Sequence, residues 1–210
     1  MGILERKERE KLELKQRILE AAKEIFIKEG FDKASIRAIA DKIEYSPATI
    51  YLHYKDKDEL FYAVHELGFD KLSEMTRSVE NIEDGFQQLR ARGLIYLKFA
   101  FENPELYDLM FIKEAPMHAL KKQEAGWDCG MHNFVALQKN LALCIEQGSI
   151  LPANIDVLSM SIWSYVHGLV SLNIRGRFEP FCELNPEIQL EKLLGESLDF
   201  MLNLIKKKNE

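Results

Sequence analysis

The sequence predicts an all-α protein. Apolar residues recur at three- and four-residue spacing along almost the whole chain of 210 residues, and runs of strict polar–apolar alternation are absent. Only six prolines interrupt the chain, and no Gly/Ser-rich linker divides it. We therefore expect connected helices, with an N-terminal three-helix domain over residues 1–57 and a larger helical domain over 58–210.

The first two helices carry clear apolar faces. The first is expected over residues 11–29 and should end at Gly30, which suits a left-handed helix cap. The second follows Ser35, a favourable N-cap. The residues expected to face inward on these two helices are Leu14, Ile18, Ala21, Ala22, Ile25, Phe26, Ile36, Ile39, Ala40 and Ile43.

Two further helix starts follow closely. Ser46 and Pro47 pair a cap with a proline at the first helical position, which predicts a third helix. Asp56, with Glu59 three residues later, resembles a capping box and predicts a fourth helix that reaches the low seventies. Beyond residue 80 the periodicity predicts helices near 82–102, 104–114, 123–147, 154–177 and 187–207.

Composition favours a soluble, cytoplasmic protein without a membrane partner. The chain is 47% hydrophobic and 30% charged, and we find neither an apolar signal region nor 18 uncharged apolar residues in a row. Three widely spaced cysteines fit a reducing compartment. The net charge is −6, yet residues 1–57 carry 13 Lys+Arg against 11 Asp+Glu, while the rest carries 15 against 23. The acidic excess lies outside the N-terminal domain, which permits DNA as a partner there.

Residues 36–53 have the pattern of a helix-turn-helix. Two helices can cross steeply where the first carries a small residue, and Ala40 supplies one. The side chains that can fill the space between them are Ile39, Ile43 and Ile50. The turn up to Tyr45 is short, so the second helix would be held with its N-terminal end outward, as in proteins that place this helix in the DNA major groove.

The exposed side of this pair has side chains suited to DNA. Ala48 and the Thr49 methyl suit thymine, and the Thr49 hydroxyl suits base or phosphate. Arg37 can hold a phosphate or reach guanine, and the polar residues after Thr49 suit phosphates. The candidate contacts are Ser35, Arg37, Tyr45, Ser46, Pro47, Ala48, Thr49, Tyr51, His53, Lys55 and Lys57. Periodicity alone also allows a plain three-helix unit with a solvated basic edge.

The stretch from Ser35 to Phe61 resembles the DNA-binding domain of TetR-family regulators, most specifically in TIYLHYKDKDELF, residues 49–61. With the first helix, the resemblance covers about residues 10–62. In that family the positions matching Thr49, Tyr51, His53 and Lys57 are commonly DNA contacts. The resemblance implies an operator-bound regulator, more often a repressor than an activator. One departure is Glu44, where the family usually has glycine; a left-handed conformation there would cost roughly 1 kcal/mol.

The last two helices are suited to pairing with a second copy. The segment 155–174 is apolar on nearly every side and must be covered on more than one face. Its small residues Ser161, Ser164, Gly168 and Ser171 would let another helix approach closely. A four-helix homodimer interface would result, with two reading helices roughly 34–36 Å apart on DNA. A monomer core is the alternative.

A second resemblance lies in this region. The residues from Trp163 to Gly168 match the Trp-x-x-x-His-Gly signature of one TetR subgroup, and 103–111 resembles its PELYxLMF segment, so this resemblance covers about residues 80–205. We expect His167 to be a packed interface residue rather than a ligand or catalyst.

A small-molecule pocket is expected among the middle helices, with no cofactor. Its candidate lining residues are Tyr96, Phe99, Tyr107, Met110, Phe111, Trp127, Met131, Phe134 and Trp163. Apolar walls with few polar groups are usual for such sites, and without a cationic cluster an apolar or aromatic effector is favoured. Effector binding would shift the fourth helix and so the DNA-reading helices.

Three other classes of function are weaker. An enzyme or metal site could use Cys129 and His132, but two residues do not complete a zinc site and no phosphate loop or nucleophile motif is present. A redox sensor would need an activated cysteine, and none lies beside a basic residue in sequence. A non-specific architectural DNA protein would be more basic overall.

Overall fold

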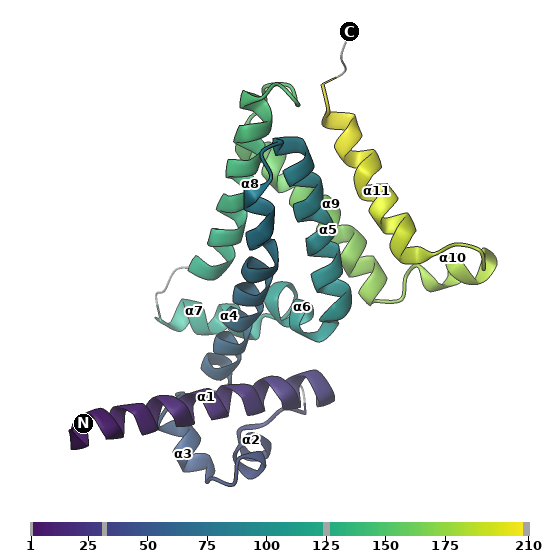
Figure 1. The fold of residues 1–210 in the computed structure, drawn as a ribbon. Helices are drawn as coiled ribbons and strands as arrows, with labels where there is room; N and C mark the ends of the chain where they lie inside the picture. The colour runs from purple at the N-terminus through teal and green to yellow at the C-terminus, as the bar shows by residue number, and fades with distance from the viewer. Residues whose placement is uncertain (1, 31–32, 124–126, 208–210) are drawn as a thin grey trace. The chain divides into compact units, whose positions relative to one another are not determined.

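The chain folds into helices, as its periodicity predicts (Figure 1). The residues that the computed structural model describes are 2–30, 33–123 and 127–207. Within these residues the backbone forms one isolated bridge, between Ile150 and Lys206, and no strand. Contacts divide the chain into two compact units, the first being Met1–Phe69 with Glu105–Trp127 and the second Asp70–Pro104 with Asp128–Glu210. The domain boundary expected between residues 57 and 58 stays a prediction, because contacts do not measure independent folding.

The first unit is built from the N-terminal helices and two short ones from the middle of the chain. Its elements are α1 (Ile3–Glu29), α2 (Ile36–Lys42), α3 (Pro47–Tyr51), the first part of α4 (Lys57–Thr76), α6 (Pro104–Phe111) and α7 (Ala115–Gln123). The expected inward stripe of α1 is confirmed: Ile18 and Ala22 are fully buried, Phe26 is nearly so, and Leu14 is half-buried.

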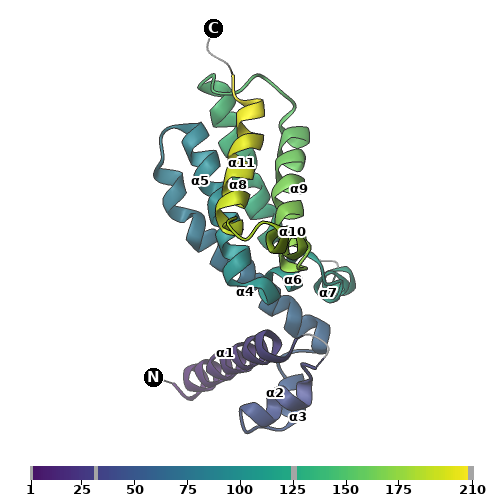
Figure 2. The ribbon, with the colours of Figure 1, turned by 90° about the vertical axis from the view of Figure 1, so that its right-hand side faces the viewer.

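The second unit is a bundle around α5. Its elements are η1 (Arg77–Asn81), α5 (Gly85–Glu102), α8 (Asp128–Glu146), α9 (Ile155–Ile174), α10 (Glu179–Leu184) and α11 (Leu190–Ile205). The helix α5 packs against α8, α9 and α11, which run beside it in Figure 2. Gly93 allows the close approach of α11, because a Cβ there would lie 2.8 Å from a methyl of Leu198.

The largest differences from the expectation are two helix starts and two additional short helices. The helix α1 begins at Ile3 instead of near Lys11, and its exposed first turns carry i,i+4 ion pairs, among them Arg6–Glu10 at 2.8 Å, which favour a solvated helix. The short helices α7 and α10 were expected to be breaks. Both have proline in the first turn, where the missing N–H breaks no helical hydrogen bond. The helix expected from residue 123 begins at Asp128, and residues 124–126 lie outside the described ones.

The helix α9 is long and apolar enough, by length and composition, to cross a membrane. It also carries Asp156, its small residues, and His167, and one side of it packs on α5 and α8. Only 22% of an 18-residue apolar stretch of this helix is buried in the single chain. A soluble core helix covered by a second copy has the same composition, so the absence of a membrane partner stays a prediction.

Candidate nucleic-acid interface

The α2–α3 pair has the packing that the sequence predicts for a helix-turn-helix. Ile39, Ala40 and Ile50 are fully buried, and Ile43 is 7% exposed. The turn closes with the Tyr45 N–H donating to the Ala40 carbonyl at 3.0 Å. The sequence left open whether the turn at Glu44 is strained or has a different geometry; Glu44 has φ 62°, the left-handed conformation. Because the residue is not glycine, the turn stores roughly 1 kcal/mol of strain.

Hydroxyl groups fix the start of each helix. The Ser35 Oγ accepts from the Ala38 N–H at 3.1 Å, and the Ser46 Oγ accepts from the Thr49 N–H at 3.2 Å. The Ser46 and Thr49 hydroxyls also lie 3.0 Å apart. Both serines therefore have a capping role beyond the predicted DNA contact, and the half-buried Thr49 hydroxyl is already held in place.

Eight of the eleven predicted contact residues are exposed to solvent. The exposed ones are Ser35, Arg37, Tyr45, Ser46, Pro47, Ala48, Tyr51 and Lys55. Thr49, His53 and Lys57 are half-buried. Leu52 is 79% exposed beside Tyr51 and was not predicted, although its position directly after that residue could have indicated it. The exposure of the eight predicted residues leaves them accessible, and the DNA contacts themselves stay a prediction.

The helix α1 braces the turn, a role that the sequence did not reveal. The Arg17 guanidinium lies 5.5 Å from the centroid of the Tyr45 ring, and its Nη2 donates to the Ile43 carbonyl at 3.5 Å. Lys42 pairs with Glu24 at 2.8 Å and, by its hydrogen bond and charge, lowers the pKa of that carboxyl. These contacts join α1 to both ends of the turn and so orient α3.

A hollow of about 450 Å³ lies beside α3, the predicted reading helix. It contains two predicted contacts, Tyr45 and His53, with Glu10 and Glu13 of α1 among its lining residues. The His53 Nδ1 is buried and has no hydrogen-bond partner among the described residues. Burial first, and then the charges of nearby lysines, lower the pKa of His53. Lys11 and Arg17 also line the hollow, and with its pKa lowered the His53 imidazole suits a hydrogen bond to phosphate better than it suits charge neutralisation.

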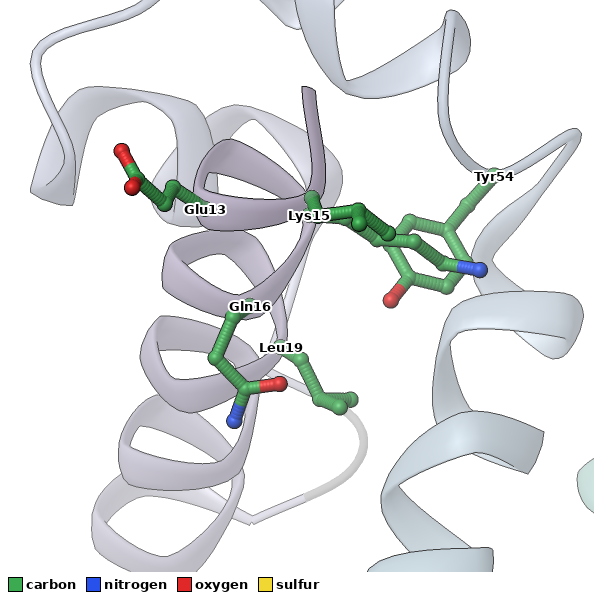
Figure 3. A pocket seen from close by; sticks show the side chains of 6 residues that line it. Glu13, Lys15, Gln16, Leu19 and Tyr54 are labelled. Carbon is green, nitrogen blue, oxygen red and sulfur yellow. The ribbon is translucent and has the colours of Figure 1, made fainter. Parts of the chain in front are cut away.

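A second hollow, of about 530 Å³, lies between α1 and Tyr54 (Figure 3). Lys15 lies over the Tyr54 ring, with its Nζ 5.4 Å from the ring centroid. Burial raises the pKa of Tyr54 to about 12, and its hydroxyl has no hydrogen-bond partner among the described residues. Leu12 and Leu19 contribute apolar walls. This tyrosine anchors the segment between α3 and α4 to α1, so it is a packing residue rather than a DNA contact.

The start of α4 is also fixed by capping. The Glu59 N–H donates to Asp56 Oδ1 at 2.9 Å, as the predicted capping box requires, whereas the Glu59 carboxylate accepts from the Lys55 N–H at 2.5 Å. Lys57 begins the helix, and its Nζ lies 5.5 Å from the centroid of the Phe61 ring. Lys55 and Lys57, the two lysines predicted to contact DNA, therefore lie where the backbone is fixed by hydrogen bonds, directly after the helix-turn-helix.

Two family profiles match the chain in consecutive segments. The profile described as "Bacterial regulatory proteins, tetR family" matches residues 18–64, and the profile described as "Tetracyclin repressor-like, C-terminal domain" matches residues 89–196, just over half of the chain. The chain belongs to the TetR family. The finer resemblance to the Trp-x-x-x-His-Gly subgroup stays a prediction.

Curated TetR-type relatives match parts of the chain. The HTH-type transcriptional activator FasR of Mycolicibacterium smegmatis is 31% identical over 100 residues, 47% of this chain and 46% of that protein. The HTH-type nicotine-responsive transcriptional repressor HdnoR of Paenarthrobacter nicotinovorans is 30% identical over 77 residues, 37% of this chain and 38% of that protein. The matches therefore span less than half the length of these relatives.

Solved structures share the TetR fold over nearly the whole chain. A TetR-family transcriptional regulator from Pectobacterium atrosepticum superposes with a TM-score of 0.74 at 20% identity, covering 96% of this chain and 98% of that one. The regulator PfmR from Thermus thermophilus superposes with a TM-score of 0.64 at 20% identity, covering 89% and 97%. At this identity the likeness concerns the fold.

The predicted ligand-lining residues of this TetR protein fall into two clusters, one in each unit. Those in the first unit are Tyr107, Met110, Phe111 and Trp127, and those in the second are Tyr96, Phe99, Met131, Phe134 and Trp163. In the second unit the Trp163 indole N–H donates to the Tyr96 hydroxyl at 3.3 Å, and the Phe134 and Trp163 ring centroids lie 5.9 Å apart. Met131 is 45% exposed in the single chain.

The first-unit cluster includes two residues that the sequence did not single out, His65 and Phe69 of α4. The Phe69 ring lies 5.3 Å from Phe111 and 5.6 Å from Trp127, both edge to face. The Tyr107 and Phe111 centroids are 4.8 Å apart. Aromatic residues at positions 62, 65 and 69 follow a three- and four-residue spacing, and this pattern could have indicated the cluster.

The helices α9 and α11 expose apolar side chains to solvent in the single chain. The exposed apolar residues of α9 are Val157, Met160 and Leu172, and those of α11 are Phe200 and Leu204. Two of the small residues on α9, Ser161 and Ser164, are exposed as well. His167 is half-buried with its pKa lowered, first by burial, and its ring packs 6.3 Å from Trp163.

The residues considered for metal or redox chemistry are His132 and the three cysteines. Among the described residues, no group of three or more His, Cys, Asp or Glu side chains is arranged to hold a metal ion. Cys144 is buried, and burial raises the pKa of its thiol to about 11, which opposes thiolate formation at neutral pH. Cys129 and Cys182 are half-buried free thiols.

Proposed function

We propose that this TetR-family protein is a ligand-responsive DNA-binding transcriptional regulator, and that it acts in the cytoplasm as a homodimeric repressor on a palindromic operator. The observation that carries the proposal is the α2–α3 pair, which is packed from within, capped at both helix starts and braced by Arg17. A helix held in this way can be inserted into a groove without losing further conformational freedom. Relatives named as transcriptional activators and repressors support the same class of function.

The roles of the contacts follow from their positions. Ala48 and Thr49 lead the short helix and would reach base edges. Tyr51 and Lys57 would contact phosphates and fix the register on the duplex. The reading helix has no Arg, Asn or Gln, so sequence preference would depend on methyl contacts, Arg37 and DNA shape.

The homodimer would form through α9 and α11. Their exposed apolar residues, with 51% of Met160 and 71% of Leu204 accessible, have the composition of an interface core rather than of a protein surface. A two-fold axis there would present two reading helices to one face of DNA. The small exposed serines of α9 would permit close helix packing across the axis.

Effector binding would act through α4. This helix belongs to the first unit up to Phe69 and to the second from Asp70, so it is shared by the reading head and the bundle. A small apolar or aromatic molecule that binds the two states of α4 unequally would change the separation of the heads and lower operator affinity.

The proposal is tested by selecting duplexes from genomic DNA with the full chain and then measuring affinity for the selected site. We expect Lys57→Ala to weaken binding to all duplexes and to reduce the salt dependence, and Thr49→Ala to change sequence preference. Lys113→Ala, a lysine outside the predicted interface, is the matched control and should leave binding unchanged. Failure to select any duplex, or equal behaviour of Lys57→Ala and Lys113→Ala, would rule out the assigned interface.

A further inference from the structure

A buried histidine at the centre of the first-unit aromatic cluster already holds an indole. His65 of α4 is fully buried, and the Trp127 indole N–H donates to its Nε2 at 3.2 Å. Tyr62 stacks on the imidazole at 5.3 Å, and Phe69 meets it edge to face at 4.9 Å. The imidazole is therefore enclosed by aromatic rings, one of which supplies a hydrogen-bond donor.

This hydrogen bond defines the chemistry of the site. Because Nε2 accepts from an N–H, it carries no proton, and the ring proton of a neutral imidazole must lie on Nδ1. Burial lowers the pKa of His65 to about 4, so the ring stays neutral and Nε2 stays an acceptor at neutral pH. An anionic group at Nε2 would find no donor there and would lose its hydration among aromatic rings.

We propose that Trp127 is a built-in placeholder, whose indole occupies the position of a planar, uncharged aromatic effector carrying an N–H or O–H donor. On binding, the donor of the effector replaces the Trp127 N–H on His65 Nε2, and the effector ring packs on Phe69. This inference rests on the proposed effector-responsive function and specifies the chemical class of the effector.

The N–H or O–H donor of the effector decides which aromatic molecules bind tightly at this site. An aromatic molecule without one would displace Trp127 and leave Nε2 buried without a partner, which should weaken binding by roughly tenfold or more. Discrimination between two molecules that differ by one donor is stronger than a purely apolar pocket can provide. Indoles, phenols and aromatic amines fit this requirement.

The position of His65 couples the exchange to α4. Three residues further along the helix, Gly68 leaves no room for a side chain, because a Cβ there would lie 2.5 Å from Met110 Sδ of α6. The helices α4 and α6 therefore pack at close range beside the imidazole. Replacement of the Trp127 ring by a free ligand would remove the contacts that Trp127 makes with His65 and Phe69 of α4.

The test compares indole with 1-methylindole, which has the same ring but no N–H, by calorimetric titration of the full chain at pH 7 without DNA. We expect saturable binding of indole and binding of 1-methylindole at least tenfold weaker. Trp127→Phe keeps an aromatic ring but removes the competing donor, so it should tighten indole binding several-fold. Tyr165→Phe is the control, because it removes an aromatic hydroxyl that bonds to Ser197 in the second unit and lies outside the predicted effector lining, and it should leave indole binding unchanged.

A third variant assigns the acceptor. His65→Phe should bind indole and 1-methylindole equally; if its far-ultraviolet circular dichroism shows unfolding, the Trp127→Phe and Tyr165→Phe pair decides alone. Equal affinities for the two probes in the natural chain, equal effects of Trp127→Phe and Tyr165→Phe, or no binding of indole up to its solubility would each overturn the inference. Operator affinity of the same preparations is measured separately, so intact DNA binding with no indole discrimination refutes this inference and leaves the proposed regulator standing.

Discussion

The reading head, which consists of helices α1 to α3, buries its apolar core within the chain, whereas the face formed by α9 and α11 exposes apolar residues to solvent. In the head, Ile39 and Ile50 are fully buried by neighbours from the same chain. On the α9–α11 face, Phe200 is 67% exposed and Val157 64% exposed in the single chain. Burial of apolar area is the main favourable term in folding. The core of the head is therefore buried within the single chain, whereas the α9–α11 face would be covered only in the proposed homodimer.

The largest expected effect tests whether the head is stabilised from within. Ile39→Ala removes side-chain atoms at a fully buried position and should lower the free energy of unfolding of the head by about 2–5 kcal/mol. Urea denaturation followed by circular dichroism measures the change. Leu52→Ala, at a residue that is 79% exposed, is the control and should cost at most about 0.5 kcal/mol. Equal losses in the two variants would contradict the comparison.

The buried imidazole of the first unit predicts a pH dependence. The pKa of His65 is about 4 in the folded chain and about 6.5 when unfolded, so the unfolded chain binds an extra proton between these values. The free energy of unfolding should have its full value above pH 6.5 and should fall by about 2–4 kcal/mol as the pH drops towards 4. His65→Phe should flatten this part of the profile, measured by denaturation at a series of pH values. An unchanged slope would show that the imidazole does not carry the effect.

The α9–α11 face is tested by placing a charge on it. Leu204→Asp should weaken a homodimer by about 2 kcal/mol or more, because the charge would lose its hydration in the interface. Sedimentation velocity at micromolar concentration should then show monomers. Leu12→Asp, at a residue that is 67% exposed on α1, is the matched control and should leave the oligomeric state unchanged. If the unaltered chain sediments as a monomer, the proposed homodimer through α9 and α11 is wrong.

A smaller effect is expected from the cap of the reading helix. Ser46→Ala removes the acceptor for the Thr49 N–H and the partner of the Thr49 hydroxyl, and should cost about 1 kcal/mol of stability. Operator affinity should fall with it, because α3 would no longer be fixed at its leading end. Ser197→Ala, which alters a hydroxyl in the second unit, should leave operator affinity unchanged. Undiminished affinity in Ser46→Ala would show that the cap does not position the reading helix.

The smallest effect is a gain. Glu44→Gly removes the strain of a left-handed side-chain residue at φ 62° and should stabilise the head by up to about 1 kcal/mol. Thermal unfolding measures the shift. Glu29→Gly, at the end of α1, is the contrasting variant and should destabilise, because that position is helical. A loss of stability in Glu44→Gly would mean that the Glu44 side chain contributes more than its backbone strain costs.

Much of the reading head was predictable because its signals are local. The spacing of Ile36, Ile39 and Ile43, the Ser46–Pro47 start and the turn at Glu44 each depend on a few consecutive residues, and the structure confirms all of them. The prolines of α7 and α10 misled because a proline read alone indicates a break, although it is tolerated in a first turn. The start of α1 was missed because solvated ion pairs, not an apolar stripe, accompany its first turns.

The sequence by itself determined that this protein is helical and where its turn and caps lie, since these follow from backbone propensity and from hydrogen bonds over three or four positions. It also named the candidate DNA contacts, which stay a prediction. Only the tertiary structure decided that Arg17 braces the turn and that His65 holds the indole of Trp127, a residue 62 positions away. Contacts between distant segments depend on how whole helices pack, and helical periodicity does not encode which faces will meet.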